Sequence, residues 1–401
     1  MKSHTRALAA AATAAGIALV ATACATSAPS PGATGSSLPP GTAPVTTEGR
    51  VAVSYEGGIA VLDGTTLEVV AELESEAFTR LNTFGDGRTI AVTTSRGFQM
   101  LDTAAPALTD VVFEAAAPGH VVVHHGSTVL FDDGTGTTTI LDTDVFADGY
   151  ALPEGTTYTA DSPHHGVSIV LEDGTLLTTV GDETVRTGAA ALHPHDDHFD
   201  VAVSSDECPG IHGEGTAKDE AVIFGCEDGA LLFQDGEFVK FTAPDAYGRM
   251  GNAFVSETSP LVVGDYKNDP DAEGYLLEAV TLIDTEARTF EVVDLPAEVR
   301  YTFRDIARGP GDLAYILSTD GQIHVLDPES GEVTDAFPVV QPWTGPADWQ
   351  DPHPAIKVNG GIAYVTEPAQ NAVHAVDLTT GEVIASADLA HTPNEIAVAT
   401  R

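Results

Sequence analysis

A short phrase that recurs along the chain limits its fold more than any other feature. It is an apolar strand that ends in Leu-Asp or a similar pair and lies between turns rich in Gly and Asp. Clear copies are Gly58–Asp63, Gly97–Asp102, Thr139–Asp142, Val280–Asp284, Gln322–Asp327 and Ala372–Asp377, and weaker copies are Thr175–Leu177 and Ala230–Phe233. No long 3.6-residue periodicity separates them, so the sequence indicates an all-β repeat.

The spacing of the copies, about 36 to 55 residues, is typical of one four-stranded propeller blade per copy. We therefore predict a single β-propeller of eight blades, or of seven if one weak copy is misassigned. The end of the chain predicts how the ring closes. Asn394–Ala399 is a lone strand, and Val51–Leu73 holds three strands without an inner one, so together they complete one blade.

The N-terminus has the pattern of an export signal. Lys2 and Arg6 precede an apolar stretch, Ala7–Val20, that is too short for a comfortable membrane span. Ala21-Thr22-Ala23-Cys24 resembles a bacterial lipobox, in which Cys24 is acylated. The alternative is ordinary cleavage that leaves Cys24 free.

These features divide the chain into three parts: a signal peptide at 1–23, a linker at 24–48 rich in Ser, Thr, Pro and Gly, and a propeller domain at 49–401. We expect an exported lipoprotein on the outer face of the cell membrane, held there only by its N-terminal lipid anchor.

The charge excludes some partners. The chain has 17 Lys and Arg against 60 Asp and Glu, which gives a formal net charge of −43. Nucleic-acid phosphates and anionic lipid headgroups would be repelled, so we expect neither partner.

In a propeller the first strand of each blade lines the central channel, and the residues at the starts of these strands converge on the axis. The predicted start positions are Arg80, His120, His164-His165, His212, Arg249, Arg304, His353 and His391. Three histidine phrases fall in consecutive blades, which predicts a metal site. A single histidine at a strand end is more often a solvated or capped side chain. Imidazoles favour zinc, and copper is disfavoured because the chain has only three Met and no thiolate cluster.

A second histidine cluster lies at His193, His195 and His198, interspersed with Asp197 and Asp200. It is predicted to be either a metal-binding arm that folds over the channel mouth or a polar surface loop.

Two cysteines, Cys208 and Cys226, flank the strand that begins at His212. In an exported protein this pair predicts a disulfide. Thiolate ligation of zinc is the alternative, but no CxxC spacing supports it.

Several of these phrases resemble the extracytoplasmic zinc metallochaperone family AztD. They are Gly119–Val122 with His125-Gly126, His164–Gly166, Cys208–Glu214 with Gly225-Cys226, Trp349–Pro352 and Pro393–Val398. The resemblance spans roughly His120 to the C-terminus. It implies a monomeric propeller without enzymatic activity that carries Zn²⁺ and delivers it to the solute-binding protein of a zinc ABC transporter by ligand exchange.

The resemblance also implies zinc ligands at His120, His165 and His212, with a carboxylate as the fourth. His165 is preferred to His164 because it precedes Gly166 as His212 precedes Gly213, and Asp197 and Asp351 are the carboxylate candidates. The acidic, His-rich flap of the family would precede the His120 phrase. Here residues 104–119 contain no such run, and the His-rich run is at 193–198 instead.

Two other classes of protein remain open. A metal-dependent propeller enzyme of the hydrolase type would need an open coordination position and a base, for which Glu214 is the candidate. A metal-free interaction scaffold on the cell surface would instead use Arg80, Arg249 and Arg304 to hold an anion.

Overall fold

A computed structural model describes residues 49–196, 198–272 and 274–400. The predicted signal peptide, Cys24 and the linker lie outside the described residues, as does Asp197. The described chain is all-β apart from three short 3-10 helices, η1 (Lys218–Glu220), η2 (Pro310–Asp312) and η3 (Pro368–Gln370). None of its helices has the length and apolar character needed to span a membrane.

The strands form eight antiparallel sheets, which are the eight blades predicted from the repeat. The first four blades contain β1 (Arg50–Tyr55), β2 (Gly58–Asp63), β3 (Val69–Glu74), β4 (Leu81–Thr83), β5 (Thr89–Thr94), β6 (Gly97–Asp102), β7 (Ala107–Glu114), β8 (Pro118–His124), β9 (Ser127–Asp132), β10 (Thr137–Asp142), β11 (Thr156–Thr159), β12 (Ser168–Val170), β13 (Leu176–Gly181), β14 (Arg186–His195) and β15 (His198–Ser205).

The other four blades and the closing strand follow in chain order. They contain β16 (His212–Ala217), β17 (Ala221–Cys226), β18 (Asp228–Gln234), β19 (Glu237–Thr242), β20 (Gly248–Arg249), β21 (Ala253–Phe254), β22 (Leu261–Tyr266), β23 (Ala279–Asp284), β24 (Thr289–Asp294), β25 (Ile306–Arg308), β26 (Ala314–Leu317), β27 (Gln322–Asp327), β28 (Glu332–Pro338), β29 (Ile356–Asn359), β30 (Ile362–Glu367), β31 (Ala372–Asp377), β32 (Glu382–Asp388) and β33 (Ile396–Ala399).

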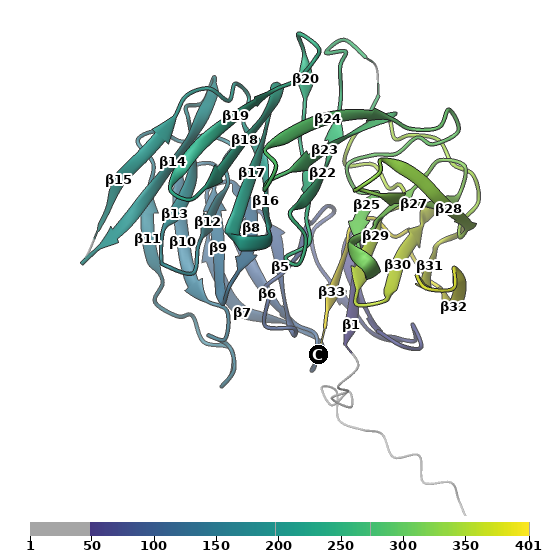
Figure 1. Ribbon diagram of the computed structural model, residues 1–401. Coiled ribbons are helices and arrows are strands. Elements are labelled where there is room, and N and C mark those ends of the chain that lie inside the picture. Colours follow the sequence, from purple (N-terminus) through teal and green to yellow (C-terminus); the bar gives the residue numbers. More distant parts are fainter. Residues whose placement is uncertain (1–48, 197, 273, 401) are drawn as a thin grey trace, which may run out of the picture. The chain divides into compact units, whose positions relative to one another are not determined.

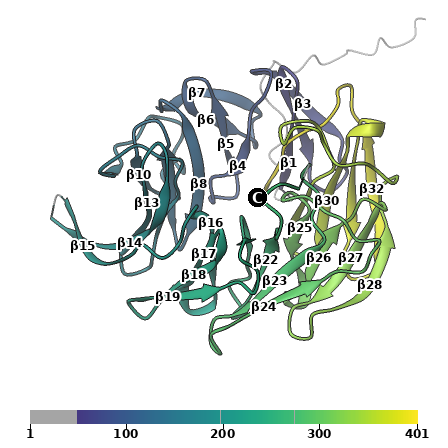
Figure 2. The ribbon, with the colours of Figure 1, turned by 90° about the horizontal axis from the view of Figure 1, so that it is seen from above.

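The ring closes as predicted. The first blade has the order β3-β2-β1-β33, so the C-terminal strand is its innermost member (Figure 1). The inner strands of neighbouring blades contact one another around the axis, as β33 does with β4 and β8 with β12, and the blades are arranged in a ring when viewed from above (Figure 2). The N-terminal and C-terminal strands thereby hold each other in one sheet.

The recurring Leu-Asp phrase has a structural cause. In most blades it is the third strand, and its last Asp accepts hydrogen bonds from backbone N–H groups of the following turn, as Asp63, Asp284 and Asp377 do. Such Asp side chains stabilise tight turns. The fourth blade departs from the pattern, because the weak copy at 175–177 falls on its second strand, and its third strand is the Ala-containing β14.

Each blade buries both faces against its neighbours. In the first blade, Val51 and Val53 pack with Tyr364 and Val373 of the eighth blade, and Ala52 packs with Ile90 and Val92 of the second. Strands such as β2 are therefore apolar on both faces, whereas outer strands such as β28 are largely exposed. This stacking holds the strand starts in register around the channel.

Candidate metal centre

Three imidazoles from consecutive blades meet at one end of the channel. His120 lies at the start of β8, His165 lies three residues before β12, and His212 begins β16. Each ring offers one nitrogen to a group whose ligand atoms all lie within 4.8 Å of one another. The Nε2 atoms of His165 and His212 are 3.1 Å apart. The structure therefore brings together the residues that their equivalent repeat positions predicted to be neighbours.

The outer nitrogen of each ring is held by a hydrogen-bond acceptor. Nδ1 of His120 donates to Gly166 O at 2.8 Å, and Nδ1 of His212 donates to Gly251 O at 2.7 Å. Nδ1 of His165 donates to the carboxylate of Asp133 at 2.5 Å. A carbonyl or carboxylate can only accept, so these bonds place the proton of each neutral ring on Nδ1. Each Nε2 then presents a lone pair to the centre of the cluster.

Lone pairs that face each other at 3.1 Å repel unless a cation lies between them. The arrangement is thus suited to a metal ion, and acceptors on the outer nitrogens are the usual way in which proteins orient histidine ligands. Tetrahedral zinc with Zn–N bonds of ~2.0–2.1 Å would place the nitrogens ~3.3 Å apart. Small shifts of the rings meet this requirement.

The environment keeps two of the rings neutral. Burial, together with the imidazoles of His212 and His165 and the guanidinium of Arg80, lowers the pKa of His120 to about 3. Burial also lowers the pKa of His212 to about 3, which the hydrogen bond to Gly251 opposes. Only neutral imidazole can ligate a metal, so both rings are ready to bind at neutral pH.

The neighbouring blades fix the backbone around His212. The carboxylate of Asp265 accepts hydrogen bonds from the N–H groups of Gly251 and Asn252, which holds the carbonyl that receives His212 Nδ1. Gly213 has φ of +62°, and a Cβ there would lie 2.4 Å from Gly251 O. Glycine is therefore required for His212 to approach the next blade.

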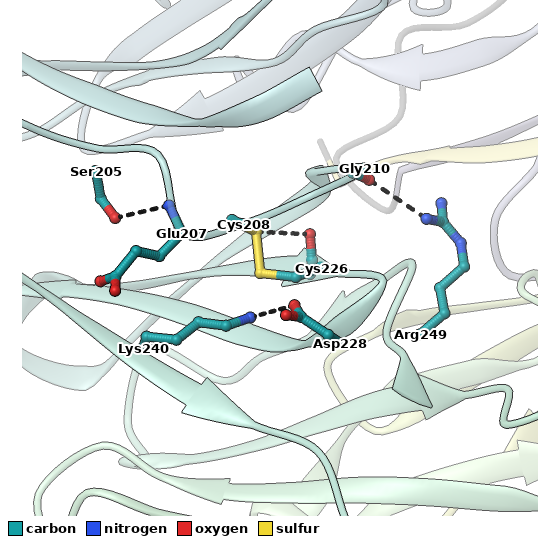
Figure 3. Close-up of a disulfide and its surroundings, with 9 residues drawn as sticks. Ser205, Glu207, Cys208, Gly210, Cys226, Asp228, Lys240 and Arg249 are labelled. Atoms are coloured by element: carbon teal, nitrogen blue, oxygen red, sulfur yellow. Dashed lines mark hydrogen bonds and ion pairs between the residues drawn. A yellow bond between two sulfur atoms is a disulfide. The ribbon is translucent and has the colours of Figure 1, made fainter. Parts of the chain in front are cut away.

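The disulfide predicted between Cys208 and Cys226 forms, and it lies beside the paired strands β16 and β17 (Figure 3). Cys226 ends β17, whose preceding residue, Gly225, pairs with His212. Both cysteines are fully buried. The disulfide ties the segment that leads into His212 to the neighbouring strand of the same blade.

The cluster opens into a cavity of about 1120 Å³. Of the predicted channel residues, Arg80, Arg249 and Arg304 line it together with the three histidines, whereas His164, His353 and His391 do not. Glu214 also lines it, and burial raises its pKa to about 7.

Other candidate ligands lie away from the cluster. His164 is buried, and its ring nitrogens are bonded to Ser162 O at 2.9 Å and Thr179 Oγ1 at 3.0 Å, so it has a structural role. Asp351 is exposed, does not line the cavity, and accepts a hydrogen bond from Asp348 N at 2.9 Å.

Of the two alternatives predicted for the 193–198 run, the described residues fit a polar surface hairpin and not an arm over the channel mouth. His193, His195 and His198 lie on the two outer strands of the fourth blade, where β14 turns into β15. Strand β14 starts near the level of His165 and runs to the opposite end of the blade, a distance of roughly 20 Å or more. This hairpin is therefore separate from the cluster.

Asp133 was missed by the sequence reasoning. It follows Asp132, the last residue of β9, and in the sequence it is one of several acidic turn residues. Its contact with His165 crosses from one blade to the next, and nothing in the local pattern marks it.

The fold and the cluster define an eight-bladed β-propeller with a three-imidazole site at one end of its channel. No family model matches the chain. The chain is 25% identical over 174 residues, 43% of its own length and 40% of the relative, to a protein of Citrobacter koseri named zinc chaperone AztD. The sequence match thus spans less than half of that relative.

Solved structures extend the similarity in fold. Apo AztD of Citrobacter koseri matches with a TM-score of 0.72 and 21% identity, over 88% of this chain and 97% of that one. A second AztD structure from Citrobacter koseri matches with a TM-score of 0.70. The dihydro-heme d1 dehydrogenase NirN shares the fold with a TM-score of 0.62 at 13% identity, over 90% of this chain and 77% of that one. The resemblance to AztD that the motifs predicted is confirmed.

Proposed function

We propose that this protein is an extracytoplasmic zinc chaperone that binds Zn²⁺ between the Nε2 atoms of His120, His165 and His212. The observation that carries the proposal is the convergence of three nitrogens whose protons are held on the opposite side of each ring. The similarity to zinc chaperone AztD supports zinc as the cargo.

The fourth coordination position is open among the described residues, because no carboxylate oxygen joins the group of three nitrogens. Asp133 is engaged with His165 Nδ1 and would act by orienting that ring. An open position suits a carrier, since an incoming ligand can bind before any histidine leaves. The separate hairpin of His193, His195 and His198 would be a secondary zinc site, for which Asp197 is a proposed ligand whose position lies outside the described residues.

The recipient in this proposal is the solute-binding protein of a zinc ABC transporter. A histidine of the recipient would enter the open position, and the three imidazoles would then release zinc one at a time. Transfer by such exchange is faster than dissociation into water, because the ion is never without protein ligands.

Mixing the zinc-loaded protein with an excess of the apo solute-binding protein tests the proposal. The transfer rate should rise with recipient concentration. It should also exceed the rate of spontaneous dissociation, which is measured with a chelator of equal affinity that only traps free zinc. A rate equal to spontaneous dissociation at every recipient concentration would contradict it.

The export-signal pattern of the N-terminus supports a proposal for where the protein is located. We propose that residues 1–23 direct export, that acylated Cys24 anchors the mature chain, and that the linker at 24–48 holds a monomeric propeller away from the membrane. Replacing Cys24 with Ala should release the protein into the medium, whereas retention of the variant in the membrane fraction would contradict lipid anchoring.

A second candidate function is metal-dependent hydrolysis. Glu214 favours it, since it lines the same cavity two residues after His212 and its pKa is raised by burial to about 7, a value suited to a general base. Hydrolysis of ester or phosphoester substrates by the zinc-loaded protein, lost in the Glu214→Gln variant, would support this function. Equal rates for the two proteins would exclude a role for Glu214.

A further inference from the structure

The cavity gathers cations in an otherwise acidic protein. The chain has 17 Lys and Arg against 60 Asp and Glu, yet five cations and five carboxylates line this cavity. Three of them, Arg80, Arg304 and Lys357, form a group that we call the cationic wall. Arg80 connects this wall to the metal centre, since its charge is one of those that act on His120.

One carboxylate serves the whole wall. Glu395 Oε1 lies 2.7 Å from Arg304 Nη2 and 3.9 Å from Arg80 Nε. The ammonium of Lys357 has no hydrogen-bond partner within the described chain. The side chain of Lys357 is exposed to the cavity. Desolvation by the surrounding protein lowers its pKa, Glu395 opposes this, and Arg80 and Arg304 lower the pKa further. Three cations therefore share a single negative charge.

The wall is built on a rigid base. Arg304 is 6% exposed, and it donates from Nη1 to Asn394 Oδ1 at 2.7 Å and from Nη2 to Trp349 O at 3.1 Å. Its Nε and the Nε of Arg80 have no hydrogen-bond acceptor within the described residues. The guanidinium carbon of Arg80 lies 5.9 Å from the centre of the Trp349 ring. Because these contacts hold the side chains in place, little entropy is lost when a ligand binds.

Four other carboxylates line the cavity, but none of them forms an ion pair with the wall in the described structure. They are Glu214, Asp265, Asp269 and Glu278. Arg304 is buried, whereas the side chain of Arg80 is partly exposed and that of Lys357 is exposed, so both can contact a ligand in the cavity. Because one carboxylate is paired with three cations, an anion that contacts the wall would balance the remaining positive charge.

We propose that Arg80, Arg304 and Lys357 bind a small anion with two or more negative charges, through carboxylate or phosphate oxygens. Guanidinium groups match the planar geometry of such oxygens, and Lys357 adds a mobile point charge. The cavity of about 1120 Å³ admits an anion of the size of citrate. The site does not depend on zinc, so it is tested on the metal-free protein.

Isothermal titration of the zinc-free protein with citrate and with inorganic phosphate tests the proposal. We expect one ion per chain, with affinity about tenfold weaker in Lys357→Gln and in Arg80→Gln. Lys267→Gln is the matched control: this cation lines the same cavity but bonds to Ala272 O instead of the wall. The affinity of the Lys267→Gln variant for either anion should stay within about twofold of that of the parent.

Citrate and phosphate distinguish the two kinds of anion that the wall could bind. Binding of citrate alone assigns a carboxylate ligand, binding of phosphate alone assigns a phosphate ligand, and binding of both assigns an oxyanion site of either kind; each result supports the proposal. Absence of binding by both anions at millimolar concentration would overturn it. So would binding that is unchanged in Lys357→Gln and Arg80→Gln, or weakened equally in Lys267→Gln.

Discussion

Replacing Asp133 with Asn isolates the contact that orients His165. The carboxylate accepts from His165 Nδ1 through Oδ2 at 2.5 Å and from Gly166 N through Oδ1 at 3.3 Å. Asn has only one acceptor oxygen. If that oxygen faces His165, the amide NH₂ faces the Gly166 N–H group, and two donors meet. If the amide turns over, its NH₂ faces His165 Nδ1, which must then accept, and the ring proton moves to Nε2.

Either orientation weakens the metal site. The first displaces the ring, and the second blocks the nitrogen that would ligate zinc. Loss of a group that orients a metal ligand typically lowers metal affinity 10–100-fold, or about 1.4–2.7 kcal/mol. We expect Asp133→Asn to fall in this range when zinc affinity is measured by competition with a chromophoric chelator at neutral pH.

The control for this prediction is Asp161→Asn, which makes the same charge change in the loop that leads to His165. Asp161 is exposed, and its side chain makes no hydrogen bond in the described structure. Thermal unfolding of both metal-free variants verifies that the fold is intact. Zinc affinity of Asp133→Asn within twofold of the parent would refute the orienting role, as would an equal loss in Asp161→Asn.

Three further predictions concern stability and the hairpin. Replacing Cys208 and Cys226 with Ser should lower the free energy of unfolding in urea by about 3 kcal/mol, because the crosslink closes an 18-residue separation; an unchanged midpoint would contradict this. Burial raises the pKa of Asp305 to about 8. The unfolded chain therefore loses this proton at lower pH than the folded one. As the pH rises from about 4 to 8, the free energy of unfolding of the parent should fall relative to that of Asp305→Asn by about 1.4 kcal/mol per pH unit. Parallel pH profiles of the two proteins would contradict this. Alanine at the three histidines of the 193–198 hairpin should leave the affinity of the tightest zinc site within about twofold, since the hairpin is roughly 20 Å away; a tenfold loss would place a ligand there.

The repeat made most of the fold predictable. An apolar run that ends in Asp, as at Asp63 and Asp377, marks both a strand and the turn that follows it. The copies could therefore be counted. The lone C-terminal strand predicted the closure of the ring with β1. The fourth blade was the hardest to assign, because β14 lacks the usual ending and the phrase at 175–177 belongs to the strand before it.

Rotational equivalence explains why the histidines were predictable. Residues at the same position of successive blades are neighbours whatever their separation in sequence, so His120, His165 and His212 could be placed together. His165 was chosen over His164 because Gly166 follows it as Gly213 follows His212. The structure gives a reason for that choice, since His164 turns toward Thr179.

Contacts that break this equivalence could not be predicted. Asp133 reaches His165 from a turn of the preceding blade, and turn acids are too numerous in this chain for one to stand out. The sequence left two positions open for the hairpin, because its residues alone do not show at which end of the blade it lies. The length of β14, which carries residue 195 to the opposite end of the blade, decides its position.

The central claim is that three imidazoles of consecutive blades share one metal ion. Anomalous diffraction at the zinc edge from crystals of the zinc-loaded protein tests it most directly. We predict a peak at ~2.0–2.1 Å from Nε2 of His120, His165 and His212. Well-occupied zinc elsewhere in the protein, with these three nitrogens unligated, would contradict it.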